Sequence, residues 1–218
     1  MKTLVAVLAL SFSVPALAAP SLNDVMQSRH IGKPLSSLGL GKPIQSGPIQ
    51  EIFLVGSCPV EVMLRPKTKT IKSITAADLS KCPGMKLEEY FGADSPALPT
   101  RLTFGQFNAL LANKEVHYWA DCLMLCGNGY EPLMHASWMP STLEGLSASS
   151  PMVDDASINA SDKWEAEMKK KYGEDYVIDT KFNCTPEFDS KAQAYLKDVR
   201  VTSITIGQPG FVFECARG

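Results

Sequence analysis

The chain has 218 residues, of which 45% are hydrophobic and 20% are charged, and its formal net charge is −2. This composition is typical of a globular protein and excludes an intrinsically disordered chain. The near balance of charge excludes a basic surface of the kind that binds nucleic acid or anionic lipid. Beyond the first segment, no apolar run approaches the roughly 18 residues of a membrane span.

The first 18 residues have the order of parts found in a secretory signal peptide. Lys2 gives a positive start, Leu4 to Val14 is almost wholly apolar, and Ala16-Leu17-Ala18 is a small-x-small cleavage signal. We therefore expect a mature chain of residues 19–218 that is periplasmic or secreted. The short, alanine-rich form of the signal is typical of bacteria.

Six cysteines, an even number in an exported chain, predict structural disulfides. Spacing alone does not choose among the possible pairings. We favour the local set, which joins Cys58 to Cys82, Cys122 to Cys126, and Cys184 to Cys215. Because Cβ atoms four residues apart in a helix lie about 5–6 Å from each other, the Cys122–Cys126 pair can close only in a turn.

The first part of the mature chain predicts a short helix followed by an antiparallel meander. Ser21 can cap the helix, and Asp24 lies in its first turn. Residues 31–49 are rich in glycine, proline and serine and are expected to form a loop. Apolar runs and alternation predict three strands, at Ile52–Val55, Val60–Leu64 and Thr70–Thr75.

The middle of the chain is expected to be less regular. Residues 82–102 are expected to be irregular, and a capping box of Thr103 and Gln106 then starts a helix. Two further strands are predicted at 116–119 and 133–138. Residues 140–161, which are rich in serine, alanine and aspartate, are predicted to form a polar surface loop or flap.

The last part predicts two helices and further strands. Apolar residues at helical spacing indicate a helix that begins near Ser161 and ends at Gly173. A second helix is expected to begin at Asp189 or Ser190. Strands are predicted at 176–184, 199–206 and 211–215. The whole pattern indicates a single disulfide-stapled α+β domain with short, mainly antiparallel strands and about four helices.

Two of the three histidines are candidates for catalysis. A hydrolase would centre on His117 or His135 with a nearby acid, because imidazole is the usual general base near neutral pH. The chain has no zinc-protease motif, and the run Gly145–Ser149 lacks the last glycine of a nucleophile elbow. These patterns give no complete catalytic set.

A second group of candidates could bind a soft metal. Thiolate, thioether and imidazole groups together suit copper, and they occur close together here at His117, Cys122, Met124, Cys126, Met134, His135 and Met139. The Cys-x-x-x-Cys spacing resembles that of exported copper chaperones, a resemblance that covers five residues and lacks the proline after the second cysteine. The competing interpretation is a disulfide with core methionines.

From these patterns we expect an exported, non-catalytic protein that binds another macromolecule in the cell envelope or outside the cell. Inhibitors, immunity factors and accessory subunits act in this way, and long polar loops offer a surface for such recognition. The expected partner is an envelope protein, and no cofactor is expected. The alternatives are a periplasmic hydrolase that uses His117 or His135, and a soft-metal or thiol-redox protein centred on Cys122 and Cys126.

Overall fold

A computed structural model describes most of the mature chain. It covers residues 19–111, 116–122, 132–138, 145–150 and 186–207, and runs of one to three residues at 159, 162–163, 166–167, 169–171 and 173. The statements below concern these residues. Predictions that fall on residues 1–18, 176–184 and 211–215 lie outside them, as do Cys126, Cys184 and Cys215.

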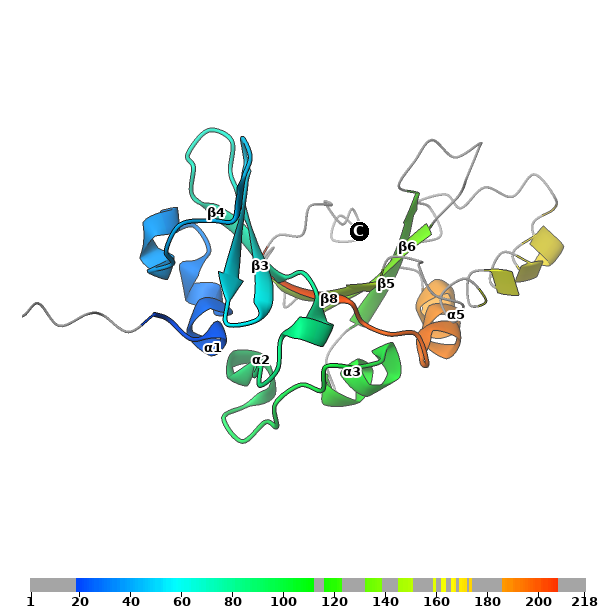
Figure 1. Cartoon of the computed structure of the whole chain (residues 1–218). Helices are drawn as coiled ribbons and strands as arrows, with labels where there is room; N and C mark the ends of the chain where they lie inside the picture. Colours follow the sequence, from blue (N-terminus) through cyan, green and yellow to red (C-terminus); the bar gives the residue numbers. More distant parts are fainter. Residues whose placement is uncertain are drawn as a thin grey trace, which may run out of the picture.

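The described strands form one antiparallel sheet of eight strands in the order β1-β2-β3-β4-β8-β7-β6-β5. Two meanders, β1 to β4 and β5 to β8, meet where β4 pairs with β8 (Figure 1). This arrangement confirms the predicted antiparallel sheet with helices. The strands are β1 Gln45–Ser46, β2 Gln50–Val55, β3 Cys58–Leu64, β4 Ile71–Ala76, β5 Val116–Cys122, β6 Pro132–Trp138, β7 Gly145–Ser150 and β8 Ser203–Gly207.

The helices of the described residues are short and pack beside the sheet (Figure 1). The named α-helices are α1 Leu22–Val25, α2 Glu88–Phe91, α3 Phe104–Leu110 and α5 Pro186–Leu196. Three 3₁₀ turns, η1 Ser28–His30, η2 Leu35–Leu38 and η3 Leu79–Lys81, complete the connections. The described positions between 159 and 171 are also helical, and Gly173 follows them with a positive φ of 103°, as predicted for its C-cap.

The number and bounds of the helices correct the sequence analysis in two places. Helix α2 lies inside the segment 82–102, which was expected to be irregular, so the described residues contain one helix more than predicted. Helix α5 begins at Pro186, three residues before the predicted Asp189. Proline favours the first helical position because its missing N–H is not needed there, and this signal was overlooked.

Alternation along the strands gives the sheet one apolar and one polar face. In β3, Val60, Val62 and Leu64 are buried, whereas Glu61 and Met63 between them are partly exposed. Across the sheet, Val62 is paired in register with Ile74 of β4, and this apolar row continues through Ile206 of β8 to Leu146 of β7. The core lies on this face, where Phe104 and Phe107 of α3 are also fully buried.

Strand β7 contradicts the prediction of a polar loop over 140–161. Residues 145–150 form an inner strand of the sheet, and five of its six residues are buried. Leu146 and Ala148 supply the core face. On the other face the Ser149 hydroxyl pairs with the hydroxyl of Ser203 on β8. Serine-rich composition suggested a solvated loop, but hydroxyls that are satisfied across strands are compatible with burial.

A disulfide staples the tip of the β2–β3 hairpin to η3. Cys58 and Cys82 are bonded, with a Cα–Cα distance of 4.4 Å, which confirms the pairing predicted for them. The Ser57 hydroxyl adds a hydrogen bond of 2.7 Å to the carbonyl of Lys81. The chain between the two cysteines contains β3 and β4, so the crosslink ties the first meander to the segment that leads to α2.

Glu167, one of the described helical positions before Gly173, is bonded to two side chains of α5. Its carboxylate accepts hydrogen bonds from the Lys191 ammonium and the Tyr195 hydroxyl. These two donors, Lys191 first, hold the pKa of Glu167 below its ordinary value of 4.5, and the same contact raises the pKa of Tyr195. The contact therefore favours the charged carboxylate of the folded protein.

We expect Glu167→Gln to destabilise the fold at neutral pH and to lose this effect in acid. Because the folded-state pKa is lowered, the stabilisation is complete above 4.5 and disappears as the pH falls through the folded value. Thermal unfolding from neutral pH down into acid measures the difference in stability between the variant and the wild type at each pH. Asp198→Asn, whose ion pair with Lys197 is exposed at 4.0 Å, is the control and should show little gap at any pH.

Candidate functional site

The register of β5 and β6 separates the residues that the sequence analysis selected. His117 pairs with Ser137, and His135 pairs with Trp119, so the two histidines occupy the same face of the sheet. Cys122 and Met134 occupy positions on the other face, which is also the face of the buried Ala148 in β7. Cys126 and Met139 lie outside the described residues. The pairing of β5 with β6 therefore places both histidines on one face of the sheet, and Cys122 and Met134 on the opposite face.

The histidine positions border a face of hydroxyl side chains. Ser149 of β7 is the direct register partner of His135, and Ser147 aligns with Thr205 and Thr75. Two pairs of hydroxyls on this face bond to each other: Thr75 to Thr205 at 2.8 Å, and Ser149 to Ser203. Hydroxyls that pair in this way across strands stabilise the sheet.

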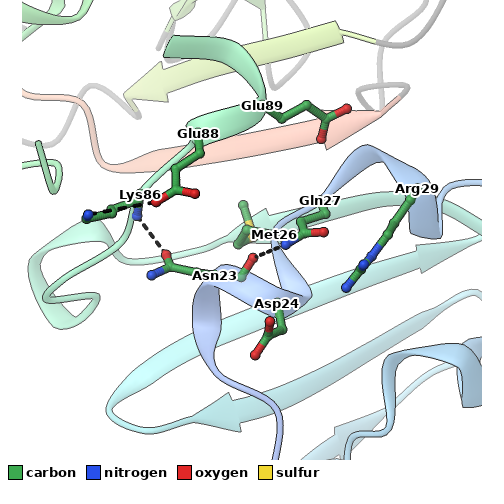
Figure 2. Close-up of a pocket in the computed structure, with 8 residues that line it drawn as sticks. All are labelled: Asn23, Asp24, Met26, Gln27, Arg29, Lys86, Glu88 and Glu89. Carbon is green, nitrogen blue, oxygen red and sulfur yellow. Dashed lines mark hydrogen bonds and ion pairs between the residues drawn. The ribbon is translucent and has the colours of Figure 1, made fainter. Parts of the chain in front are cut away.

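A pocket of about 420 Å³ lies within the described residues, between the N-terminal helical segment and the chain around α2 (Figure 2). This volume lies within the usual range for small-ligand sites, roughly 300–1,000 Å³. The pocket is lined by two amides, three carboxylates, two cations and one thioether, from Asn23, Asp24, Met26, Gln27, Arg29, Lys86, Glu88 and Glu89.

A capping box forms the first wall of the pocket. The Ser21 hydroxyl accepts a hydrogen bond from the Asp24 N–H, and the Asp24 carboxylate accepts one of 3.0 Å from the Ser21 N–H. The short helix α1 begins here because both orphan donors are satisfied. Hydrogen bonds from Ser21 hold the pKa of Asp24 below its usual value, and the nearby charge of Arg29 acts in the same direction.

Asn23 joins the two walls of the pocket. Its side-chain oxygen accepts a hydrogen bond of 2.7 Å from the Lys86 N–H, and its side-chain N–H donates to the carbonyl of Gly84. The Gln27 side chain donates back to the Asn23 carbonyl at 2.8 Å, as the dashed lines in Figure 2 show. Each amide is thus fixed by main-chain groups, so the walls are formed before any ligand arrives.

Glu89 and His30 hold the rim of the pocket. The Glu89 carboxylate accepts hydrogen bonds from both the N–H and the hydroxyl of Ser28, which joins α2 to η1. The buried His30 ring donates from Nε2 to the Asp24 carbonyl at 2.9 Å. His30 therefore has a positioning role beside the pocket.

The two cations of the pocket differ in their ion pairing. The Lys86 ammonium lies 3.7 Å from the Glu88 carboxylate, a partly exposed ion pair of the weak kind. Within the described part of the chain, the Arg29 guanidinium has no hydrogen-bond or ion-pair partner, and Figure 2 shows it across the pocket from Lys86 and Glu88. A guanidinium offers five N–H donors in a plane that matches a carboxylate or phosphate.

Sequence reasoning did not select these pocket residues. It named Ser21 and Asp24 only as a helix start, and it treated 82–102 as irregular. The available signal was charge density: Lys86, Glu88 and Glu89 crowd into four positions of a segment that is pinned by Cys82. Nothing in the sequence pairs this segment with Asn23, which is 63 residues away from Lys86.

Among the described residues, no cluster of three or more histidine, cysteine or carboxylate side chains is arranged to hold a metal ion. No helix in the same ranges has the length and apolar character needed to cross a membrane. Comparison with known protein families, curated proteins and solved structures gave no match.

Proposed function

We propose that this chain is an exported, non-catalytic protein that binds another macromolecule in the cell envelope or outside the cell, as an inhibitor, immunity factor or accessory subunit does. One observation carries the proposal. The pocket beside α1 has polar walls fixed by main-chain hydrogen bonds, yet the Arg29 guanidinium in it has no partner among the described residues. A fixed site with an unused charge is suited to recognition, because little ordering is needed on binding.

The disulfide supports the part of the proposal that concerns the compartment. Such bonds persist in oxidising compartments and are rare in the cytosol, and the Cys58–Cys82 bond agrees with the secretory signal indicated by residues 1–18. The hydroxyl face supports a non-catalytic function, since two of its hydroxyl pairs, Thr75 with Thr205 and Ser149 with Ser203, bond to each other.

Crosslinked affinity capture tests the proposal. Mature protein is incubated with envelope and culture fluid of its own organism, crosslinked, and analysed by mass spectrometry. We expect one stoichiometric protein partner. Arg29→Gln should reduce its capture about tenfold or more, because a charge-assisted contact contributes roughly 1.5–3 kcal/mol. Arg101→Gln, an exposed arginine outside the pocket, is the matched control and should capture normally.

The absence of any stoichiometric partner would contradict the proposal. A hydrolase is the second candidate, because the register places His135 directly opposite Ser149. A serine-reactive phosphonate that labels Ser149 in the wild type but not in His135→Ala would favour the hydrolase over the binding protein.

A further inference from the structure

Two opposite charges remain available in the pocket, and they lie on different sides of it. Among the described residues, Arg29 makes no hydrogen bond or ion pair, although its charge acts on the nearby Asp24, and Glu88 has only the ion pair of 3.7 Å with Lys86. The other two carboxylates are already used: Asp24 accepts from Ser21, and Glu89 accepts from Ser28. Among the described residues, the pocket therefore presents on one side a guanidinium without a hydrogen-bond or ion-pair partner, and on the other side a weakly held carboxylate (Figure 2).

The Lys86 ammonium already pairs with Glu88, so the ammonium group of a ligand shares this carboxylate with Lys86 or displaces it. The two amides of the pocket are bound to main-chain groups. Both side-chain groups of Asn23 are bound to main-chain atoms, and the Gln27 amide N–H is bound to the Asn23 carbonyl. Met26 is buried and gives the pocket a small apolar floor. A complementary ligand thus has an anion at one end, a cation at the other, and a short stem between them.

We propose that this pocket binds a peptide that carries a free carboxylate and an ammonium group. The carboxylate pairs with the Arg29 guanidinium as a planar, bidentate acceptor, and the ammonium group is placed at the Glu88 carboxylate. This inference rests on the proposed function, because it names the chemistry of the partner at the same site. The charged groups can belong to a free short peptide or to the end of a partner protein chain.

Four tripeptides test this inference directly. Trialanine is used with both ends free, with the amine acetylated, with the carboxylate amidated, and with both ends blocked. Binding is followed by the NMR shifts of the backbone amides at 23–29 and 84–89 during titration of the mature protein. We expect the form with both ends free to bind best, and amidation to weaken binding about tenfold or more.

Two variants locate each end of the peptide. The Arg29→Gln variant should bind the free and the amidated peptide equally, because it lacks the guanidinium that distinguishes a carboxylate from an amide. Glu88→Gln should remove the preference for a free amine over an acetylated one, and Arg101→Gln should behave as the wild type. Both pocket side chains are exposed, so the variants are expected to keep the thermal midpoint of the wild type.

The two proposals fail in different ways. If no tripeptide shifts the pocket amides, or all four bind alike, this inference is wrong, even where a protein partner is captured. If the free tripeptide binds with the expected preferences and no protein partner is captured, the inference holds for a free peptide and the proposed function fails. Displacement of a captured partner by the tripeptide identifies the end of the partner chain as the source.

Discussion

Replacing Cys58 and Cys82 together with alanine is expected to lower the free energy of unfolding by about 3 kcal/mol. The bond closes a loop of 24 residues in sequence separation, and its loss restores conformational freedom to the unfolded chain. It also frees the tip of the β2–β3 hairpin from η3. Chemical denaturation of variant and wild type under oxidising conditions measures the difference.

The double variant is compared with the wild type in the presence and absence of reductant. Reductant should lower the stability of the wild type by at least the effect of the two substitutions, since Cys58 and Cys82 are both buried and bonded. An unchanged midpoint in the double variant would show that this bond contributes nothing to stability.

Gly207→Ala is expected to destabilise the fold by about 3 kcal/mol, through overpacking and backbone strain together. Gly207 ends β8, where it pairs with Ser73 on one side and Gly145 on the other. An added Cβ would lie 2.6 Å from the Lys72 carbonyl oxygen and 2.7 Å from Cδ1 of Ile31. The residue also has a φ of +98°, which side chains rarely adopt.

Gly32→Ala separates the two causes. Gly32 has a φ of +79°, and nothing lies within 4 Å of its added Cβ, so only the strain of about 1 kcal/mol should remain. Equilibrium unfolding of both variants gives the two free energies. Equal losses of stability in the two variants would show that the contacts of the added Cβ with Lys72 and Ile31 do not determine the effect of Gly207→Ala.

Features with short-range causes were predicted well from the sequence. The alternation of Val60, Val62 and Leu64 predicted the buried face of β3, and Thr103 with Gln106 predicted the start of α3 by a capping box. The pairing of Cys58 with Cys82 was also correct. In each of these cases the residues that decide the structure lie on one element or on neighbouring elements of the chain.

Features that depend on distant neighbours were predicted poorly. Ser147 and Ser149 suggested a solvated loop, because their cross-strand partners come from β8, more than 50 residues later. The pocket was missed for the same reason, since Asn23 meets Lys86 only after the chain has folded. Polar side chains are ambiguous in sequence, because their burial is tolerated only where partners exist.

The sequence by itself predicted an export signal and the antiparallel strands of the first meander, and it favoured the pairing of Cys58 with Cys82. The signal and the strands follow from local hydrophobicity and turn chemistry, and the pairing follows from a preference for local disulfides. The tertiary structure alone decided the inner position of β7, the placement of His117 and His135 on one face of the sheet, and the pocket in which Arg29 makes no hydrogen bond or ion pair with a described residue. Those outcomes depend on strand register and on hydrogen bonds between distant segments, which no local pattern specifies.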